Sequence, residues 1–189
     1  MSLAVPLDGT NGTGNEWQIA VDPDNAGKRE DWFRAIRPEA RTAVVPGTIQ
    51  QVFPGYHGVA WFWCEFDSVP VDTTSERCWV HFGGVDHYAD VWLNGVRLGS
   101  HEGCDLDFAL DATEALEPSG RNLLAVRVIN PGHDRVDDFV ISEVPHSFKQ
   151  RDDYSFGSNA NSGGIIFPVE LRVLPVVRVT DVFAQADVN

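Results

Sequence analysis

The stretch VHFGGVDHYADVWLNGVRLGSHEG, residues 80–103, decides the fold. Its three short apolar runs, VHF, ADVWL and VRLG, are separated by GGVDH and by Asn94-Gly95. Asn-Gly between alternating apolar runs is typical of a two-residue β-hairpin, because both residues tolerate the positive φ that a type I′ turn requires. The stretch therefore predicts a β-meander with one turn at each interruption.

Short apolar runs continue on both sides of this meander. In residues 60–68 (AWFWCEFDS), alternation places Trp61 and Trp63 on one face and Phe62 and Cys64 on the other, as in a central strand between two layers. Many short apolar runs at short intervals, with almost no helical periodicity, are typical of an all-β sandwich and favour a jelly roll. Further strands are expected at 16–22, 42–45, 78–82, 88–93, 97–100, 107–110, 122–130, 165–174 and 176–186, with one helical turn at 111–116.

The composition excludes several classes of partner. The 189 residues are 43% hydrophobic and 11% aromatic, enough for a sizeable core. The 28 acidic residues outnumber the 14 basic ones, giving a net charge of −14. Nucleic acids and anionic membranes select clustered Lys and Arg, so neither is an expected partner. A neutral ligand such as a sugar suits this charge.

The cysteines and histidines indicate neither disulfides nor a metal. Cys64, Cys78 and Cys104 are odd in number and form no CxxC pair, and the first two lie in apolar runs, so buried thiols are expected. The six histidines show no zinc-binding spacing. No cofactor is predicted, and a structural Ca²⁺ ion has no support in the sequence.

The termini and the hydropathy pattern bear on localisation. No apolar run reaches the length of about 18 residues that a membrane helix requires. The first residues, MSLAVPLDG, lack the basic and apolar regions of a signal peptide. With free cysteines, this pattern favours a soluble, cytoplasmic protein.

Six pieces of the chain together carry a family signal. The central piece, HFGGVDHYADVWLNGVRLGSHEG (81–103), is the most specific. With the others, the chain resembles the N-terminal sugar-binding domain of glycoside hydrolase family 2, the group of β-galactosidases, β-glucuronidases and β-mannosidases. The other pieces, in the family's order, are VDPDNAGKREDWF (21–33), VPGTIQ (45–50), GVAWFWCEF (58–66), NLLAVRV (122–128) and GGIIFPVEL (163–171).

The resemblance implies a galactose-binding-like jelly roll that precedes an immunoglobulin-like domain and a (β/α)₈ barrel. Residues 1–15 are then a leader, partly disordered or left over from cloning, and 16–175 are the jelly roll. Residues 176–189 correspond to a linker and the truncated first strand of the following domain. In the family, two glutamates of the barrel perform the reaction. The chain is therefore expected to hold no catalytic residue. Asn15-Glu16 superficially resembles the Asn-Glu pair that carries the family's acid/base, but that pair belongs to the barrel, whereas Glu16 begins a sandwich strand.

Asp86 is the strongest candidate for sugar contact. In relatives, the resemblance implies, the matching residue projects towards the barrel's active site and holds a sugar hydroxyl, which a carboxylate can do through a directional hydrogen bond. The competing interpretation is that Asp86 only braces the Gly83-Gly84 turn. His87 flanks it, and a histidine in a turn is expected to be exposed to solvent.

A second candidate group lies in the long polar segment 131–164, whose Asp, Asn, Ser and Gly content indicates a functional or partly ordered loop. Relatives place an Asp about six residues before the Gly-Ile that matches Gly164-Ile165. Here that position is Ser158, with Asp153 upstream and Asn161 between, so loop propensity alone also explains them.

The tryptophans divide into two groups. Trp61, Trp63, Trp79 and Trp92 lie inside apolar strands, where core packing is favoured over sugar stacking. Trp32 lies in the polar segment 23–38, which we expect to be an irregular loop or short helix that Trp32 and Phe33 anchor. It is the more plausible exposed platform.

Three hypotheses follow. The first is a non-catalytic accessory domain of a family 2 glycosidase, with carbohydrate and the other domains of the full-length chain as partners. The second is a stand-alone carbohydrate-binding module, and the third is a structural spacer. The particular sugar and linkage are not encoded in any residue pattern found.

Overall fold

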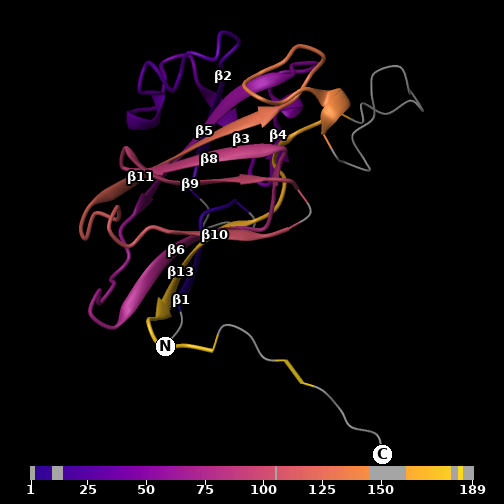
Figure 1. Cartoon of the computed structure of the whole chain (residues 1–189). Helices are drawn as coiled ribbons and strands as arrows, with labels where there is room; N and C mark the ends of the chain where they lie inside the picture. The colour runs from indigo at the N-terminus through magenta and orange to yellow at the C-terminus, as the bar shows by residue number, and fades with distance from the viewer. Residues whose placement is uncertain (1–2, 10–14, 105, 145–160, 180–182, 185–189) are drawn as a thin grey trace, which may run out of the picture.

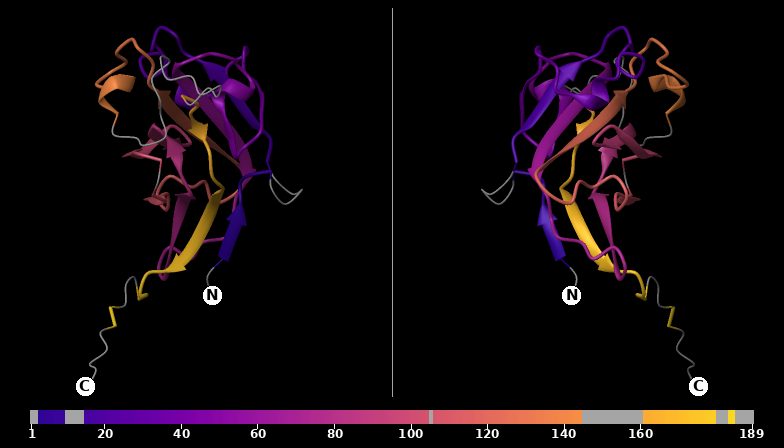
Figure 2. Two further views of the ribbon diagram at one scale, coloured as in Figure 1. Left: turned by 90° about the vertical axis from the view of Figure 1, so that its right-hand side faces the viewer. Right: turned by 90° about the vertical axis from the view of Figure 1, so that its left-hand side faces the viewer.

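The computed structural model describes residues 3–9, 15–104, 106–144, 161–179 and 183–184. Within them the chain forms a β-sandwich of two antiparallel sheets, with a small third sheet at one end (Figures 1 and 2). The all-β jelly-roll prediction is confirmed. Short 3₁₀ helices, η1 (Trp32–Arg34), η2 (Ile49–Gln51) and η3 (Ile141–Glu143), lie in the connections. No helix of the described residues is long and apolar enough to cross a membrane.

The six-stranded sheet has the order β3-β2-β5-β11-β8-β9. Its centre is the ten-residue pairing of β5 with β11, two strands that are apolar on both faces as the sequence indicates. Its strands are β2 (Trp17–Val21), β3 (Arg41–Ala43), β5 (Gly58–Asp67), β8 (Tyr88–Leu93), β9 (Val96–Glu102) and β11 (Arg121–Asn130).

The four-stranded sheet has the order β1-β13-β6-β10 and lies below the first in Figure 1. Its strands are β1 (Leu3–Pro6), β6 (Glu76–Phe82), β10 (Phe108–Asp111) and β13 (Val169–Pro175). β1 belongs to the segment assigned from sequence to a leader, yet it pairs with β13 at the sheet edge. Residues 165–174 form two strands instead of one, because the chain leaves the sheet at Phe167 and Pro168.

The main core lies between the two sheets. Phe62, Cys64 and Phe66 of β5 meet Val80 and Phe82 of β6 in it, all nearly inaccessible to solvent. Burial of each large apolar side chain contributes about 1.5–3 kcal/mol to folding. The same burial raises the pKa of Cys64 to about 12 and that of Cys78 to about 11. The expectation of buried thiols is confirmed.

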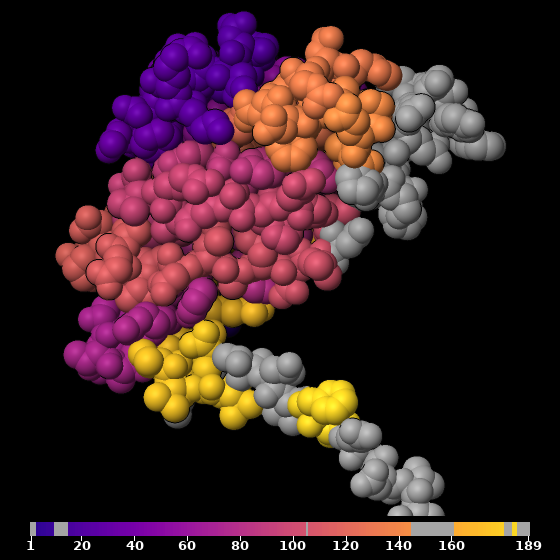
Figure 3. All heavy atoms as spheres, in the orientation of Figure 1, coloured from indigo at the N-terminus to yellow at the C-terminus, as the bar shows by residue number. Residues whose placement is uncertain are grey.

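The outer face of the six-stranded sheet carries a second apolar cluster of aromatic side chains. Trp61 and Trp63 of β5 lie here, on the opposite face from Phe62, as predicted. The rings of Trp61 and Trp92 pack against each other, tilted by 32° with their centres 5.2 Å apart. Two connections cover this face, loop 22–40 and loop 131–140, drawn in indigo and orange (Figure 3). The sandwich therefore has a third layer made of loops.

The predicted meander is half right. Asn94 and Gly95 have φ of 51° and 81° and join β8 to β9 in the expected hairpin. The GGVDH connection, however, is not a hairpin, because it takes the chain from β6 in one sheet to β8 in the other. Its glycines are required by close packing: a Cβ on Gly83 would lie 2.8 Å from Cβ of Phe167, and one on Gly84 would lie 2.8 Å from the Phe167 ring.

Of two smaller predictions, the turn at 111–116 agrees with the structure and the strand at 176–186, in the residues that the structure describes, does not. Residues 111–116 form one hydrogen-bonded turn, in which the carbonyl of Ala112 accepts from the amides of Ala115 and Leu116. The described part of segment 176–189, residues 176–179 and 183–184, contains no strand, and Val177 is 91% exposed.

Candidate functional site

Asp86 lies in the third sheet, which brings together three segments that are far apart in sequence. Its strands are β4 (Gly47–Thr48), β12 (Gly164–Ile165) and β7 (Val85–Asp86). Gly164 pairs with Thr48 on one side and with Asp86 on the other. Asp86 is only 6% exposed, and the peptide bond to His87 is cis. This sheet fixes the position of the Asp86 backbone.

Asn130 and Asn161, both buried, form a polar group with the half-buried His57 beside this sheet. Nδ1 of His57 lies 3.3 Å from Nδ2 of Asn130 and 3.2 Å from Nδ2 of Asn161. Asn161 also donates to the carbonyl of Pro131 at 2.8 Å, and its own carbonyl accepts from Asn130 at 3.2 Å. An imidazole nitrogen facing two amide groups acts as an acceptor, so the proton of a neutral His57 is on Nε2.

Gly163 connects this polar group to Asp86. A Cβ at position 163 would lie 2.5 Å from the carbonyl oxygen of Asp86 and 2.7 Å from Cγ of Asn130. The amide of Gly163 donates to Oε1 of Gln50 at 3.2 Å, and Gln50 donates in turn to the carbonyl of Tyr56. The site is thus tightly packed polar backbone and side chains, which is suited to holding hydroxyl groups in fixed directions.

Tyr56 is neutral beside this group. Burial, together with the negative charge of Asp22, raises the pKa of its hydroxyl to about 12. The hydroxyl donates to the carbonyl of Val59 at 2.8 Å.

A hollow of about 320 Å³ opens beside His87. Nε2 of His87 lies 3.5 Å from Oε1 of Glu102, and its ring meets that of Phe139 edge-on at 5.7 Å. An aromatic ring among carboxylates is a common way to bind a sugar, because the ring contacts C–H groups while the oxygens accept from hydroxyls. The lining residues are His87, Glu102, Asp138, Phe139, Val140, Glu143 and Val144.

The predicted site residues have different fates in the structure. Asp86 and His87 lie together, and Asn161 lies in the polar group that Gly163 connects to them. The expectation that His87 is exposed is wrong, since only 2% of it is accessible to solvent. Asp153 and Ser158 lie outside the described residues, as do Asp152 and Asn159.

Trp32 is an anchor of loop 22–40. It is 8% exposed and lies 6.3 Å from the ring of Trp61, so the expected exposed platform is wrong. Its carbonyl accepts a hydrogen bond from Nε1 of Trp63, and its own Nε1 donates to Glu30. The Trp32 ring covers part of the outer apolar face of the six-stranded sheet. The polar composition of segment 23–38 gives no indication of this contact.

Comparison with known proteins identifies the family of this architecture. Residues 57–157, from the start of β5 through the connection after β11, match the model of the glycosyl hydrolase 2 galactose-binding domain-like family. The chain belongs to this family.

Its relatives are much longer proteins. A β-glucuronidase of Paenibacillus borealis is 26% identical over an alignment of 186 positions that covers 92% of this chain but 30% of the relative. A β-galactosidase of Arthrobacter is 30% identical over 116 residues, 61% of this chain and 10% of the relative. This family 2 domain therefore spans about 30% or less of the length of these relatives.

Solved structures show the same fold. The β-glucuronidase of an uncultured Clostridium superposes with a TM-score of 0.69 at 27% identity, over 93% of this chain and 29% of the other. The Ruminococcus gnavus β-glucuronidase gives a TM-score of 0.70 at 22% identity, again over 93% and 29%. The resemblance predicted from the six sequence pieces is confirmed.

Three residues of the family 2 domain site were missed by sequence reasoning: Gln50, His57 and Asn130. Gln50 ends the piece 45–50, His57 directly precedes the piece 58–66, and Asn130 lies two residues after the piece 122–128. A polar residue at or near the end of three of the six pieces was a usable signal. In the described ranges, no group of three or more His, Cys, Asp or Glu side chains could hold a metal ion.

Proposed function

We propose that this chain is a non-catalytic accessory domain of a family 2 glycosidase. The observation that carries the proposal is the match along 92% of the chain to a β-glucuronidase of which it covers only 30%. In such an enzyme the two carboxylates that cleave the glycosidic bond belong to another domain. The role of the present chain is then to shape one side of the active-site mouth.

The end of the sandwich with the third sheet suits that role. It gathers Asp86, His87 and Asn161, together with the half-buried amide of Gln50 and the buried amide of Asn130. Carboxylate and amide oxygens select hydroxyl groups by direction and distance. In the parent enzyme these groups would hold a hydroxyl of the non-reducing sugar, with residues 152–161 as a further contact segment. The names of the relatives favour β-glucuronides or β-galactosides as substrates.

The test uses the parent enzyme with a nitrophenyl β-glucuronide and a nitrophenyl β-galactoside. Asp86→Asn keeps the shape of the side chain but removes its charge. We expect KM for the hydrolysed substrate to rise about tenfold with a smaller change in kcat, because a ground-state sugar contact is weakened.

Asp31→Asn is the matched control. Asp31 is an exposed residue with φ of 55°, a conformation that Asn tolerates equally well. It should leave both constants unchanged. If Asp86→Asn also leaves them unchanged while the protein unfolds at the wild-type temperature, the contact role is refuted and the spacer hypothesis is preferred.

A stand-alone carbohydrate-binding module is the second candidate, and the hollow beside His87 is the observation in its favour. A module must bind sugar by itself, whereas an accessory domain supplies only part of a pocket. Isothermal titration of the 189-residue chain against a panel of monosaccharides and β-glycosides separates the two. Binding that Asp86→Ala abolishes would support the module; no measurable heat supports the accessory domain.

A further inference from the structure

Arg127 is a fully buried cation in an apolar surface. It lies on β11 between Ala125 and Ile129, whose side chains belong to the aromatic cluster on the outer face of the six-stranded sheet. None of the Arg127 side chain is exposed, and its Nε has no hydrogen-bond partner among the described residues. The proposed sugar contacts do not involve it. Its burial therefore requires another explanation.

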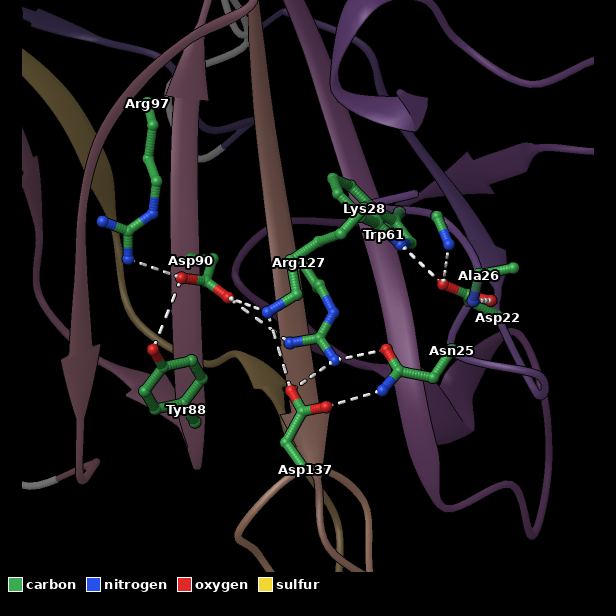
Figure 4. Close-up of polar contacts among 11 residues, drawn as sticks. Asp22, Asn25, Ala26, Lys28, Trp61, Tyr88, Asp90, Arg97, Arg127 and Asp137 are labelled. Atoms are coloured by element: carbon green, nitrogen blue, oxygen red, sulfur yellow. Dashed lines mark hydrogen bonds and ion pairs between the residues drawn. The ribbon is translucent and has the colours of Figure 1, made fainter. Parts of the chain in front are cut away.

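Its guanidinium joins the sheet to both covering loops (Figure 4). One NH2 group donates to Asn25 of loop 22–40 and, at 2.9 Å, to Oδ2 of Asp137 in loop 131–140. The other lies 3.4 Å from Oδ2 of Asp90 on β8. Asn25 also donates to Asp137 at 2.7 Å, so that three elements meet in one hydrogen-bonded ring.

Flanking cations complete the network. Lys28 lies 3.4 Å from Asp90 and 3.7 Å from Asp137, and Arg97 donates to Oδ1 of Asp90 at 2.8 Å.

Asn25 and Asp137 both have φ of 49°, the left-handed conformation that Asn and Asp accept more readily than other side chains. Each loop thus presents its partner for Arg127 from a turn of defined geometry.

Loop 131–140 also forms part of the hollow. Two backbone hydrogen bonds of 2.9 Å between Val136 and Phe139 close a turn around Asp137. Phe139 directs its ring to Tyr88 at 4.8 Å and to His87 at 5.7 Å, and it lines the hollow with Asp138. The residue that Arg127 holds is therefore two positions from the ring that packs on His87.

We propose that Arg127, with Asp90, is a positioning residue that holds loop 131–140 against His87 and so sets the wall of the hollow beside the candidate sugar contacts. Stability alone does not explain the arrangement, because a buried ion pair replaced by an apolar side chain of similar volume often leaves stability unchanged or increases it. The positioning of the loop is independent of function, while its effect on sugar contact rests on the proposed function.

Arg127→Met is the decisive variant. Methionine fills similar space among the tryptophans but cannot form the hydrogen bonds that Arg127 donates to Asn25 and Asp137 in the two loops. Hydrogen exchange measured by mass spectrometry should show that protection in residues 133–143 and 22–31 falls about tenfold or more while the central strands β5 and β11 keep theirs. Arg121→Met is the matched control on the same strand, because Arg121 is exposed and pairs only at the surface with Glu65. It should leave both loops unchanged.

Asp137→Ala covers the case in which Arg127→Met does not fold. It removes the loop partner from a partly exposed position and should loosen 133–143 more than 22–31, which loses only the contacts of Asn25 and Lys28 with Asp137. Unchanged exchange in loop 131–140 of either folded variant would overturn the positioning role, whatever the parent enzyme does.

The kinetic arm tests the link to sugar binding. In a parent enzyme that hydrolyses β-glycosides, Arg127→Met should raise KM about threefold or more with kcat nearly constant, and Arg127→Lys should recover part of the loss. Loosened loops with an unchanged KM would overturn the link. A parent enzyme without glycosidase activity would refute the proposed function, while the exchange experiment would still decide whether Arg127 positions the loop.

Discussion

The Asn94-Gly95 turn gives a prediction whose magnitude follows from the structure. Nδ2 of Asn94 donates to the carbonyl of Ala115 at 2.9 Å and to Oδ1 of Asn122 at 2.7 Å, and Oδ1 accepts from the amide of Leu123 at 2.9 Å. The side chain therefore ties the β8–β9 hairpin to the start of β11. Asn94→Gly keeps the backbone conformation but loses these three hydrogen bonds. At about 0.5–1.5 kcal/mol each, the loss is roughly 1.5–4.5 kcal/mol of unfolding free energy.

Asn94→Ala loses the same hydrogen bonds and adds backbone strain. The φ of 51° costs a residue with a Cβ about 1 kcal/mol or more, so alanine should be less stable than glycine at this position. Urea unfolding followed by tryptophan fluorescence measures both variants against the wild type. The reasoning is refuted if Asn94→Gly stays within about 0.5 kcal/mol of the wild type, or if alanine proves at least as stable as glycine.

Three further predictions concern the site, the loops and the core. Gly163→Ala should lower stability by about 2 kcal/mol or more in thermal unfolding, because its Cβ would overlap the carbonyl of Asp86; a wild-type melting temperature would contradict this packing. Partial burial alone would raise the pKa of Asp137, but the charges of Arg127 and Lys28 and the hydrogen bonds from Asn25 and Arg127 together outweigh it and lower the pKa. Its contribution is therefore complete above the unfolded pKa of about 3.9 and is lost as pH falls through the lower folded value. The stability gap between the wild type and Asp137→Asn should stay constant from about pH 7 to 5 and shrink only below about pH 4, and shrinkage near neutral pH would refute the assignment. Cys64 and Cys78, with pKa values raised to about 12 and 11, should resist a thiol reagent at about pH 8 until the protein is unfolded in guanidinium; rapid labelling of the folded chain would show that they are accessible.

The sequence was sufficient to predict local structure that depends on alternation and turn chemistry. The two faces of β5 follow from the unbroken run of apolar residues from Val59 to Cys64, and the β8–β9 hairpin follows from Asn94-Gly95. The family resemblance could be recognised from the sequence because most of its pieces are strands with their adjoining turns, which are local patterns.

Structure that depends on distant contacts was not predictable in this way. Gly83-Gly84 has the composition of a turn, yet the glycines are there to admit Phe167, which comes more than 80 residues later. Trp32 and His87 lie in polar segments, and their burial results from what other elements place over or under them. The two-residue strands β4, β7 and β12 are too short to produce a periodic pattern.

Arg127 illustrates the limit most clearly. In the run NLLAVRVIN it is the one charged residue, and its charge alone favours an exposed side chain. It is buried because two loops, one distant in sequence and one directly after its own strand, converge on it. Their partners Asn25 and Asp137 are 102 and 10 residues away.

The most direct test of the accessory role compares the parent enzyme with the 189-residue chain in the hydrolysis of a nitrophenyl β-glucuronide and a nitrophenyl β-galactoside. We predict turnover by the parent and none by the isolated chain, because the carboxylate pair that cleaves the bond belongs to another domain. Turnover by the isolated chain that a single carboxylate substitution abolishes would contradict the account.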